Sequence, residues 1–174
     1  MAAQRRMEAV KGAVLALLTD SYQRRDQVAV ITFRGAKATV LLSPTRSVDL
    51  AEQRMRELST GGRTPLPHAL QLTLELLEKN TGANSLQPLL VLLSDGKANV
   101  ALDVDGDPWH ETLTLAGLLA EQGTPALVID TETGFLRLGR AAQLAKALAG
   151  ECLSLEELTA ESLTLTIRGS IKTT

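Results

Sequence analysis

The stretch PLLVLLSDG (88–96) decides the fold, because its run of apolar residues ends abruptly in an aspartate and a glycine. Such a run, bounded by turn residues, is typical of a strand buried on both faces of a parallel sheet. An unpaired carboxylate is costly to bury, so we expect Asp95 at the carboxyl edge of the sheet, just beyond the strand. In open α/β sheets this edge is where ligands bind.

A second signal, TGGRTPL (60–66), lies upstream and presents Thr64 just before a helical pattern. The carboxylate of Asp95 and the hydroxyl of Thr64 are oxygen ligands of the kind that hard cations such as Mg²⁺ bind. Thr64 and Asp95 are therefore the candidate metal ligands. Taken alone, these residue types favour a second interpretation, in which Asp95 caps a turn and Gly61 and Gly62 supply tight-turn geometry.

Helical and strand patterns alternate around these signals. Apolar residues at three- and four-residue spacing predict helices, and short apolar runs predict strands. The expected elements are a helix over 2–20, strands over 27–33 and 38–44, helices over 48–58 and 66–79, a strand over 88–94, a helix over 109–122, a strand over 124–130, a helix over 137–149, a strand over 151–154 and a last helical segment over 155–168. The turn between the first two strands is too short for a parallel crossover, so 38–44 is expected to be antiparallel. The pattern predicts one doubly wound α/β domain over 1–174, with a mostly parallel sheet and one antiparallel edge strand.

Some local features follow from the same patterns. Ser47 is placed to cap the helix that follows it. Cys152 is the only cysteine, which excludes an internal disulfide and predicts a buried thiol in a reducing compartment. The side chains expected in the core are Leu50, Met55 and Leu58 of the helix over 48–58, and Leu138, Leu144 and Leu148 of the helix over 137–149.

Charge and hydropathy limit the class of partner. The 18 Lys and Arg are spread among 20 acidic residues, for a net charge of −2, and form no basic block, which argues against nucleic acid. The sequence has no apolar run long enough to cross a membrane and no secretory signal at its N-terminus. We expect a cytoplasmic protein whose partners are other proteins.

The order of these pieces resembles the von Willebrand factor A, or integrin I, domain. In that family a divalent cation lies at the carboxyl edge of the sheet, held by a D-x-S-x-S loop after the first strand, a threonine from a second loop and an aspartate that ends the fourth strand. GGRTPL matches the threonine loop with Thr64, and LLSDG matches the aspartate with Asp95. More narrowly, DQVAVITFRG, STGGRTPL, LLVLLSDGKANV, DGDPW and PALVIDTETG are similar to the C-terminal domain of the magnesium chelatase D subunit.

The sequence departs from that family at its start, because the chain begins at the helix that would follow the first strand. The usual first central strand and its D-x-S-x-S ligands are absent, so Mg²⁺ binding is expected to be weak or absent. The missing strand would lie between 27–33 and 88–94. These two strands are then expected to pair directly, to shift, or to recruit another chain, and their open apolar edges favour self-association.

The resemblance implies a non-catalytic interaction domain of ATP-dependent magnesium chelatase, which inserts Mg²⁺ into protoporphyrin IX in chlorophyll biosynthesis. The expected partners are the AAA+ ATPase subunit and the porphyrin-binding subunit, and we assign no catalytic or cofactor-binding residue. One alternative is a generic domain of this type that partners another AAA+ ATPase, such as a cobalt chelatase relative. Another is a small Mg²⁺-dependent hydrolase using Asp95, Asp103 and Asp105. An EF-hand is excluded at DVDGD (103–107), since Pro108 and Thr114 occupy its required glycine and glutamate positions.

Overall fold

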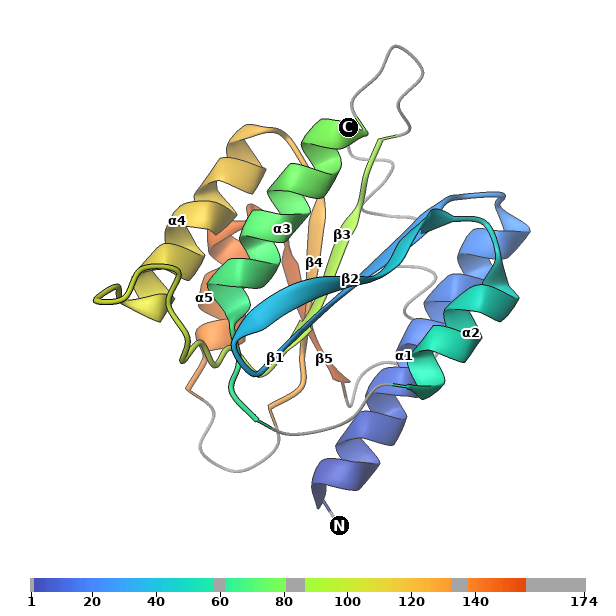
Figure 1. Cartoon of the computed structure of the whole chain (residues 1–174), viewed down its shortest axis with the longest axis horizontal. Coiled ribbons are helices and arrows are strands. Elements are labelled where there is room, and N and C mark those ends of the chain that lie inside the picture. The colour runs from blue at the N-terminus through green and yellow to red at the C-terminus, as the bar shows by residue number, and fades with distance from the viewer. Residues whose placement is uncertain (1, 58–61, 81–86, 133–137, 156–174) are drawn as a thin grey trace.

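Helices and strands alternate along the chain as the sequence patterns predict. The computed structural model describes residues 2–57, 62–80, 87–132 and 138–155 (Figure 1). Within them the elements are α1 (Ala2–Gln23), β1 (Val28–Arg34), β2 (Lys37–Thr45), α2 (Val48–Arg56), α3 (Leu66–Lys79), β3 (Leu90–Ser94), α4 (Pro108–Glu121), β4 (Ala126–Asp130), α5 (Arg140–Ala147) and β5 (Glu151–Ser154). The helical segment expected over 155–168 lies outside the described residues, apart from residue 155.

The strands form two sheets in the described part of the chain. β3, β4 and β5 make a parallel sheet with β4 in the middle, and its register pairs Leu90 with Ala126 and Ser94 with Asp130. β1 and β2 make a separate antiparallel pair. The α/β class and the antiparallel strand are thus confirmed. The direct pairing offered as one outcome for 27–33 and 88–94 does not occur, so β1 and β3 each keep one edge without a strand partner among the described residues.

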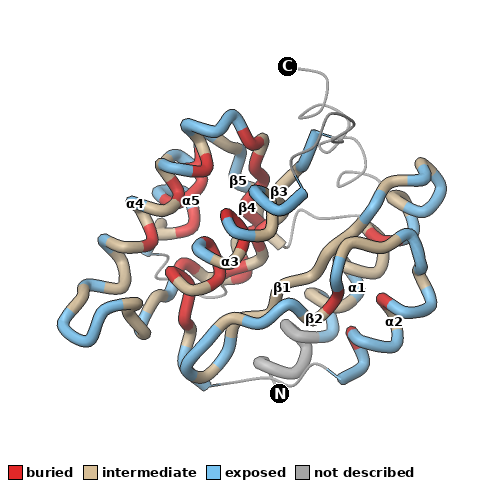
Figure 2. The backbone as a smooth tube through the Cα atoms, turned by 45° about the horizontal axis from the view of Figure 1, so that its top comes forward, coloured by how far each residue is buried: buried red, intermediate tan, exposed pale blue. Residues whose placement is uncertain are grey.

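The main core lies on one face of the parallel sheet. Leu92 and Val128 point to this face and pack against buried side chains of α3, α4 and α5. On the opposite face Leu127 and Ile129 are fully buried, with Leu17 of α1 among the side chains against them. Figure 2 shows the buried residues concentrated in α3, α4, α5 and β4. The alternation along β4 explains this, because successive side chains of a strand point to opposite faces.

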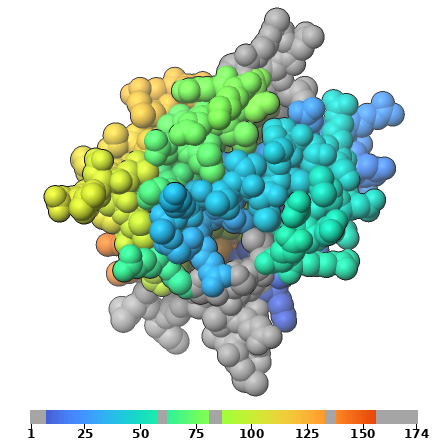
Figure 3. Space-filling model, viewed as in Figure 1, coloured from blue at the N-terminus to red at the C-terminus, as the bar shows by residue number. Residues whose placement is uncertain are grey.

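A second, smaller core belongs to the antiparallel pair. It joins Leu18 of α1, Leu42 of β2, and Ala51 and Met55 of α2. Figure 3 shows the β1–β2 hairpin crossing this face of the molecule between α3 and α2. β1 is only half-buried along most of its length, whereas four of the five residues of β4 are buried.

The structure confirms the Ser47 cap, since the amide of Leu50 donates to Ser47 Oγ at 3.3 Å. Met55, Leu144 and Leu148 are buried as expected, but Leu50 is 39% exposed and Leu138 is 62% exposed. Leu58 lies outside the described residues. The prediction that Leu138 lies in the core is wrong because α5 begins only at Arg140. Gly139 before it is in the left-handed conformation, so Leu138 is not on the helix. Cys152 is exposed rather than buried, because β5 is the outer strand of its sheet.

Candidate site at the carboxyl edge of the sheet

The turn Ser94-Asp95-Gly96 ends β3 at the carboxyl edge of the parallel sheet. Ser94 is buried, its carbonyl accepts from Thr131 N at 3.1 Å, and its Oγ accepts from Gly96 N at 3.1 Å. Gly96 has φ +72°, and a Cβ there would lie 2.5 Å from the Cβ of Arg140. Only glycine satisfies both the conformation and the close approach of α5. The turn therefore fixes where Asp95 leaves the strand.

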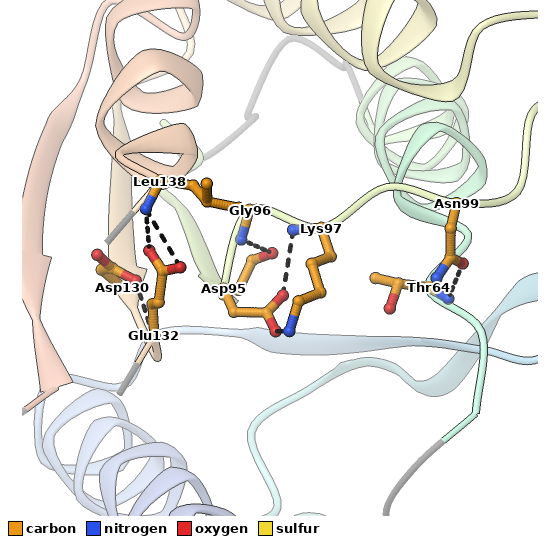
Figure 4. Close-up of polar contacts among 9 residues, drawn as sticks. Thr64, Asp95, Gly96, Lys97, Asn99, Asp130, Glu132 and Leu138 are labelled. Carbon is orange, nitrogen blue, oxygen red and sulfur yellow. Dashed lines mark hydrogen bonds and ion pairs between the residues drawn. The ribbon is translucent and has the colours of Figure 1, made fainter. Parts of the chain in front are cut away.

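Both carboxylate oxygens of Asp95 are bound by one residue, Lys97 (Figure 4). The Lys97 backbone amide donates to Oδ1 at 3.1 Å, and its ammonium nitrogen Nζ lies 2.9 Å from Oδ2. The Asp95 side chain is 19% exposed and that of Lys97 is 57% exposed. The carboxylate is thus mostly covered, and its charge is balanced by an internal cation.

Thr64 is brought to the same edge by Asn99. The amide of Thr64 donates to Asn99 Oδ1 at 2.7 Å, and the amide of Asn99 donates to the Thr64 carbonyl at 3.1 Å. Gly35, in the β1–β2 turn, donates to the carbonyl of Arg63 at 3.0 Å. These bonds join the hairpin, the segment before α3 and the segment after β3, so both predicted residues lie on one connected rim. Asn99 was missed from the sequence; its only signal is an amide side chain four residues after Asp95.

The end of β4 adds two more carboxylates to this edge. Asp130 Oδ1 accepts from Glu132 N at 2.8 Å. The carboxylate of Glu132 accepts from Leu138 N, at 3.3 Å for Oε1 and 3.1 Å for Oε2. Both carboxylates thus accept from backbone amides of described residues that follow β4.

The acidic loop before α4 is organised by its own helix. Asp107 caps α4 by accepting from Trp109 N at 2.8 Å and His110 N at 3.2 Å. Glu111 reaches back to accept from Leu102 N at 2.6 Å and from Asp103 N at 3.3 Å. Sequence reasoning missed Glu111, whose role depends on how the loop folds over the helix. Asp103 and Asp105 are exposed on this loop.

A family model for the von Willebrand factor type A domain matches residues 1–97, more than half of the chain. The chain belongs to this family.

Among relatives, this type A domain is 46% identical to the uncharacterized protein Rv2850c of Mycobacterium tuberculosis, over 97% of this chain and 26% of that protein. It is 37% identical to the magnesium-chelatase 67 kDa subunit of Heliobacterium mobile, over 95% of this chain and 26% of that subunit. It is 36% identical to the uncharacterized protein MJ0910 of Methanocaldococcus jannaschii, over 94% of both chains. The chain thus spans about a quarter of the first two relatives and nearly all of the third.

Solved structures agree on the fold of the type A domain. BatB from Bacteroides thetaiotaomicron superposes with a TM-score of 0.71 at 17% identity, over 96% of this chain and 89% of that one. At this identity the similarity concerns the fold alone. No helix among the described residues is both long enough and apolar enough to cross a membrane.

The residues present in this type A domain supply few ligands for the family's divalent cation. Thr64 and Asp95 offer one hydroxyl and one carboxylate, whereas Mg²⁺ requires an octahedral shell of six oxygen ligands. The Asp95 carboxylate already holds the ammonium of Lys97. Within the described ranges, no three His, Cys, Asp or Glu side chains come together closely enough to hold a metal ion. The described residues do not fit a self-sufficient metal site.

Proposed function

We propose that this type A domain is a non-catalytic protein-interaction domain of an ATP-dependent metal chelatase of the magnesium chelatase type. The observation that carries the proposal is its 37% identity, over 95% of the chain, to the magnesium-chelatase 67 kDa subunit of Heliobacterium mobile. The Mg²⁺ that such an enzyme inserts into protoporphyrin IX is a substrate of the whole assembly. In this proposal the domain couples the AAA+ ATPase ring to the porphyrin-binding subunit.

The carboxyl edge is the face we assign to the partner. It presents Thr64 and Asp95 on segments held together by Asn99, so the surface is already formed before a partner binds. A preformed polar surface loses little conformational entropy on binding. We propose that Mg²⁺ adds to this surface only weakly, because the described residues leave most of its ligand shell to water.

A second candidate is a type A domain that serves a different AAA+ ATPase, such as a cobalt chelatase relative. Its support is that relatives named only as uncharacterized proteins, from M. tuberculosis and M. jannaschii, match nearly the whole chain at 46% and 36% identity. Insertion assays that offer Mg²⁺ and Co²⁺ to the same reconstituted subunits would distinguish the two.

The hydrolase interpretation has less support. Asp95 is bound to Lys97, and the loop of Asp103 and Asp105 is organised around Glu111. An assay with p-nitrophenyl phosphate and Mg²⁺ tests it directly, and turnover abolished by Asp95→Ala would favour it.

A binding measurement tests the proposed function: the affinity of the chain is measured for purified AAA+ and porphyrin-binding subunits encoded in the same genome. Asp95→Ala is expected to weaken binding about tenfold, from the roughly 1.5 kcal/mol that a hydrogen bond to a charged group contributes. Asp95→Asn keeps the shape and one oxygen, so its effect should be smaller. Glu75→Ala removes an exposed carboxylate of α3 and is the matched control. Unchanged binding and unchanged reconstituted chelation with Asp95→Ala would refute the role of this edge.

A further inference from the structure

The Lys97 ammonium is a cation already bound to the Asp95 carboxylate, with Nζ 2.9 Å from Oδ2. One residue contacts both carboxylate oxygens, through its amide at 3.1 Å and its ammonium at 2.9 Å. Only 19% of the Asp95 side chain is exposed, so a second cation finds little open surface on this side chain. In Figure 4 the Lys97 side chain lies on the side of Asp95 that faces Thr64, between the two predicted metal ligands.

We propose that Lys97 is an internal cation that competes with divalent metal for Asp95. This inference rests on the assignment of the carboxyl edge as the functional face. A divalent ion at Asp95 and the Lys97 ammonium repel each other, so each weakens the binding of the other to the carboxylate. Lys97 thereby keeps the edge free of metal at low concentrations of divalent ions and lowers the apparent affinity of Asp95 for them.

The chemistry of lysine suits this role. Its ammonium is a compact point charge on a flexible four-carbon stem, so it can bind Asp95 and leave it without a change in the backbone. The Lys97 side chain is 57% exposed, which gives it room to move into solvent. The amide contact from Lys97 to Oδ1 does not depend on the ammonium, so Asp95 keeps its orientation when the side chain moves.

Mn²⁺ is a suitable probe, since it prefers oxygen ligands as Mg²⁺ does and its paramagnetism broadens nearby amide resonances. Lys97→Met removes the charge and keeps a long side chain, and it should tighten Mn²⁺ binding about two- to fivefold, the range set by a partly exposed ion pair. Lys79→Met, at the far end of α3, removes the same charge elsewhere and should leave the affinity unchanged. Broadening should centre on the amides of Gly96 and Lys97.

A double-mutant cycle shows whether the effect passes through Asp95. In the Asp95→Ala background, Lys97→Met should no longer alter Mn²⁺ affinity. The proposal is overturned if Lys97→Met binds Mn²⁺ no more tightly than the unchanged chain, or if its effect persists without Asp95. Partner binding is measured separately, so loss of the Lys97 effect and loss of the partner role of Asp95 are distinct results.

Discussion

Gly96→Ala measures how tightly α5 is packed on the turn that carries Asp95. Gly96 has φ +72°, where a residue with a Cβ costs about 1–2 kcal/mol. A Cβ would also lie 2.5 Å from Arg140 Cβ and 2.8 Å from Ala141 N, so the backbone of α5 would have to shift. Overpacking of this kind costs about 1–3 kcal/mol more. We expect Gly96→Ala to lower the free energy of unfolding by about 2–5 kcal/mol in total.

Gly123→Ala provides the control. Gly123 has the same φ of +72°, but nothing lies within 4 Å of the position of an added Cβ. Gly123→Ala should therefore lower the free energy of unfolding only by the conformational cost of about 1–2 kcal/mol. Urea denaturation of both variants, followed by circular dichroism, gives the difference directly. Equal destabilisation of the two variants would refute the close packing of α5 on the turn.

Three further predictions concern other parts of the chain. Leu119→Ala should cost about 2–5 kcal/mol because Leu119 is fully buried, while Leu118→Ala, 45% exposed, should cost far less; similar denaturation midpoints would contradict the assigned core. Glu111→Ala should speed hydrogen exchange at the Leu102 and Asp103 amides, with Glu121→Ala as the control on the same helix, and unchanged exchange would mean that Glu111 does not hold the loop. Because β1 and β3 each have an open edge in the described residues, light scattering should detect concentration-dependent dimers or larger species, whereas a monomer at all concentrations would show that these edges are protected.

The sequence predicted elements more reliably than it predicted side-chain contacts. The apolar run before Ser94 and the alternation of patterns were enough to place the ten elements of the described residues within a few residues. Burial was less predictable where it depends on a neighbouring element. The predicted burial of Leu138 was wrong because α5 starts later than the apolar spacing suggested. The predicted burial of Cys152 was wrong because the order of strands in a sheet cannot be read from the local sequence.

The candidate site shows the same division. Asp95 and Thr64 could be placed at the carboxyl edge because strand ends and loop glycines have local signatures. The residues that bind them, Lys97 at Asp95 and Asn99 at Thr64, could not be predicted from the sequence. An ammonium at the end of a flexible stem can reach several groups, and the Asn99 amide pairs with a residue 35 positions earlier, a contact made only by the folded chain.

The three hydrophobic clusters of the described residues differ in size, which gives the molecule regions of different local stability. The small cluster of Leu18, Leu42, Ala51 and Met55 joins α1, β2 and α2, and Phe33 of β1 also packs against the main core, while β4 is buried on both faces. Local opening requires less free energy where fewer apolar contacts are lost. Among the described residues, the hairpin and α2 are therefore expected to open more often than β4, and limited proteolysis should cut them before it cuts the main core.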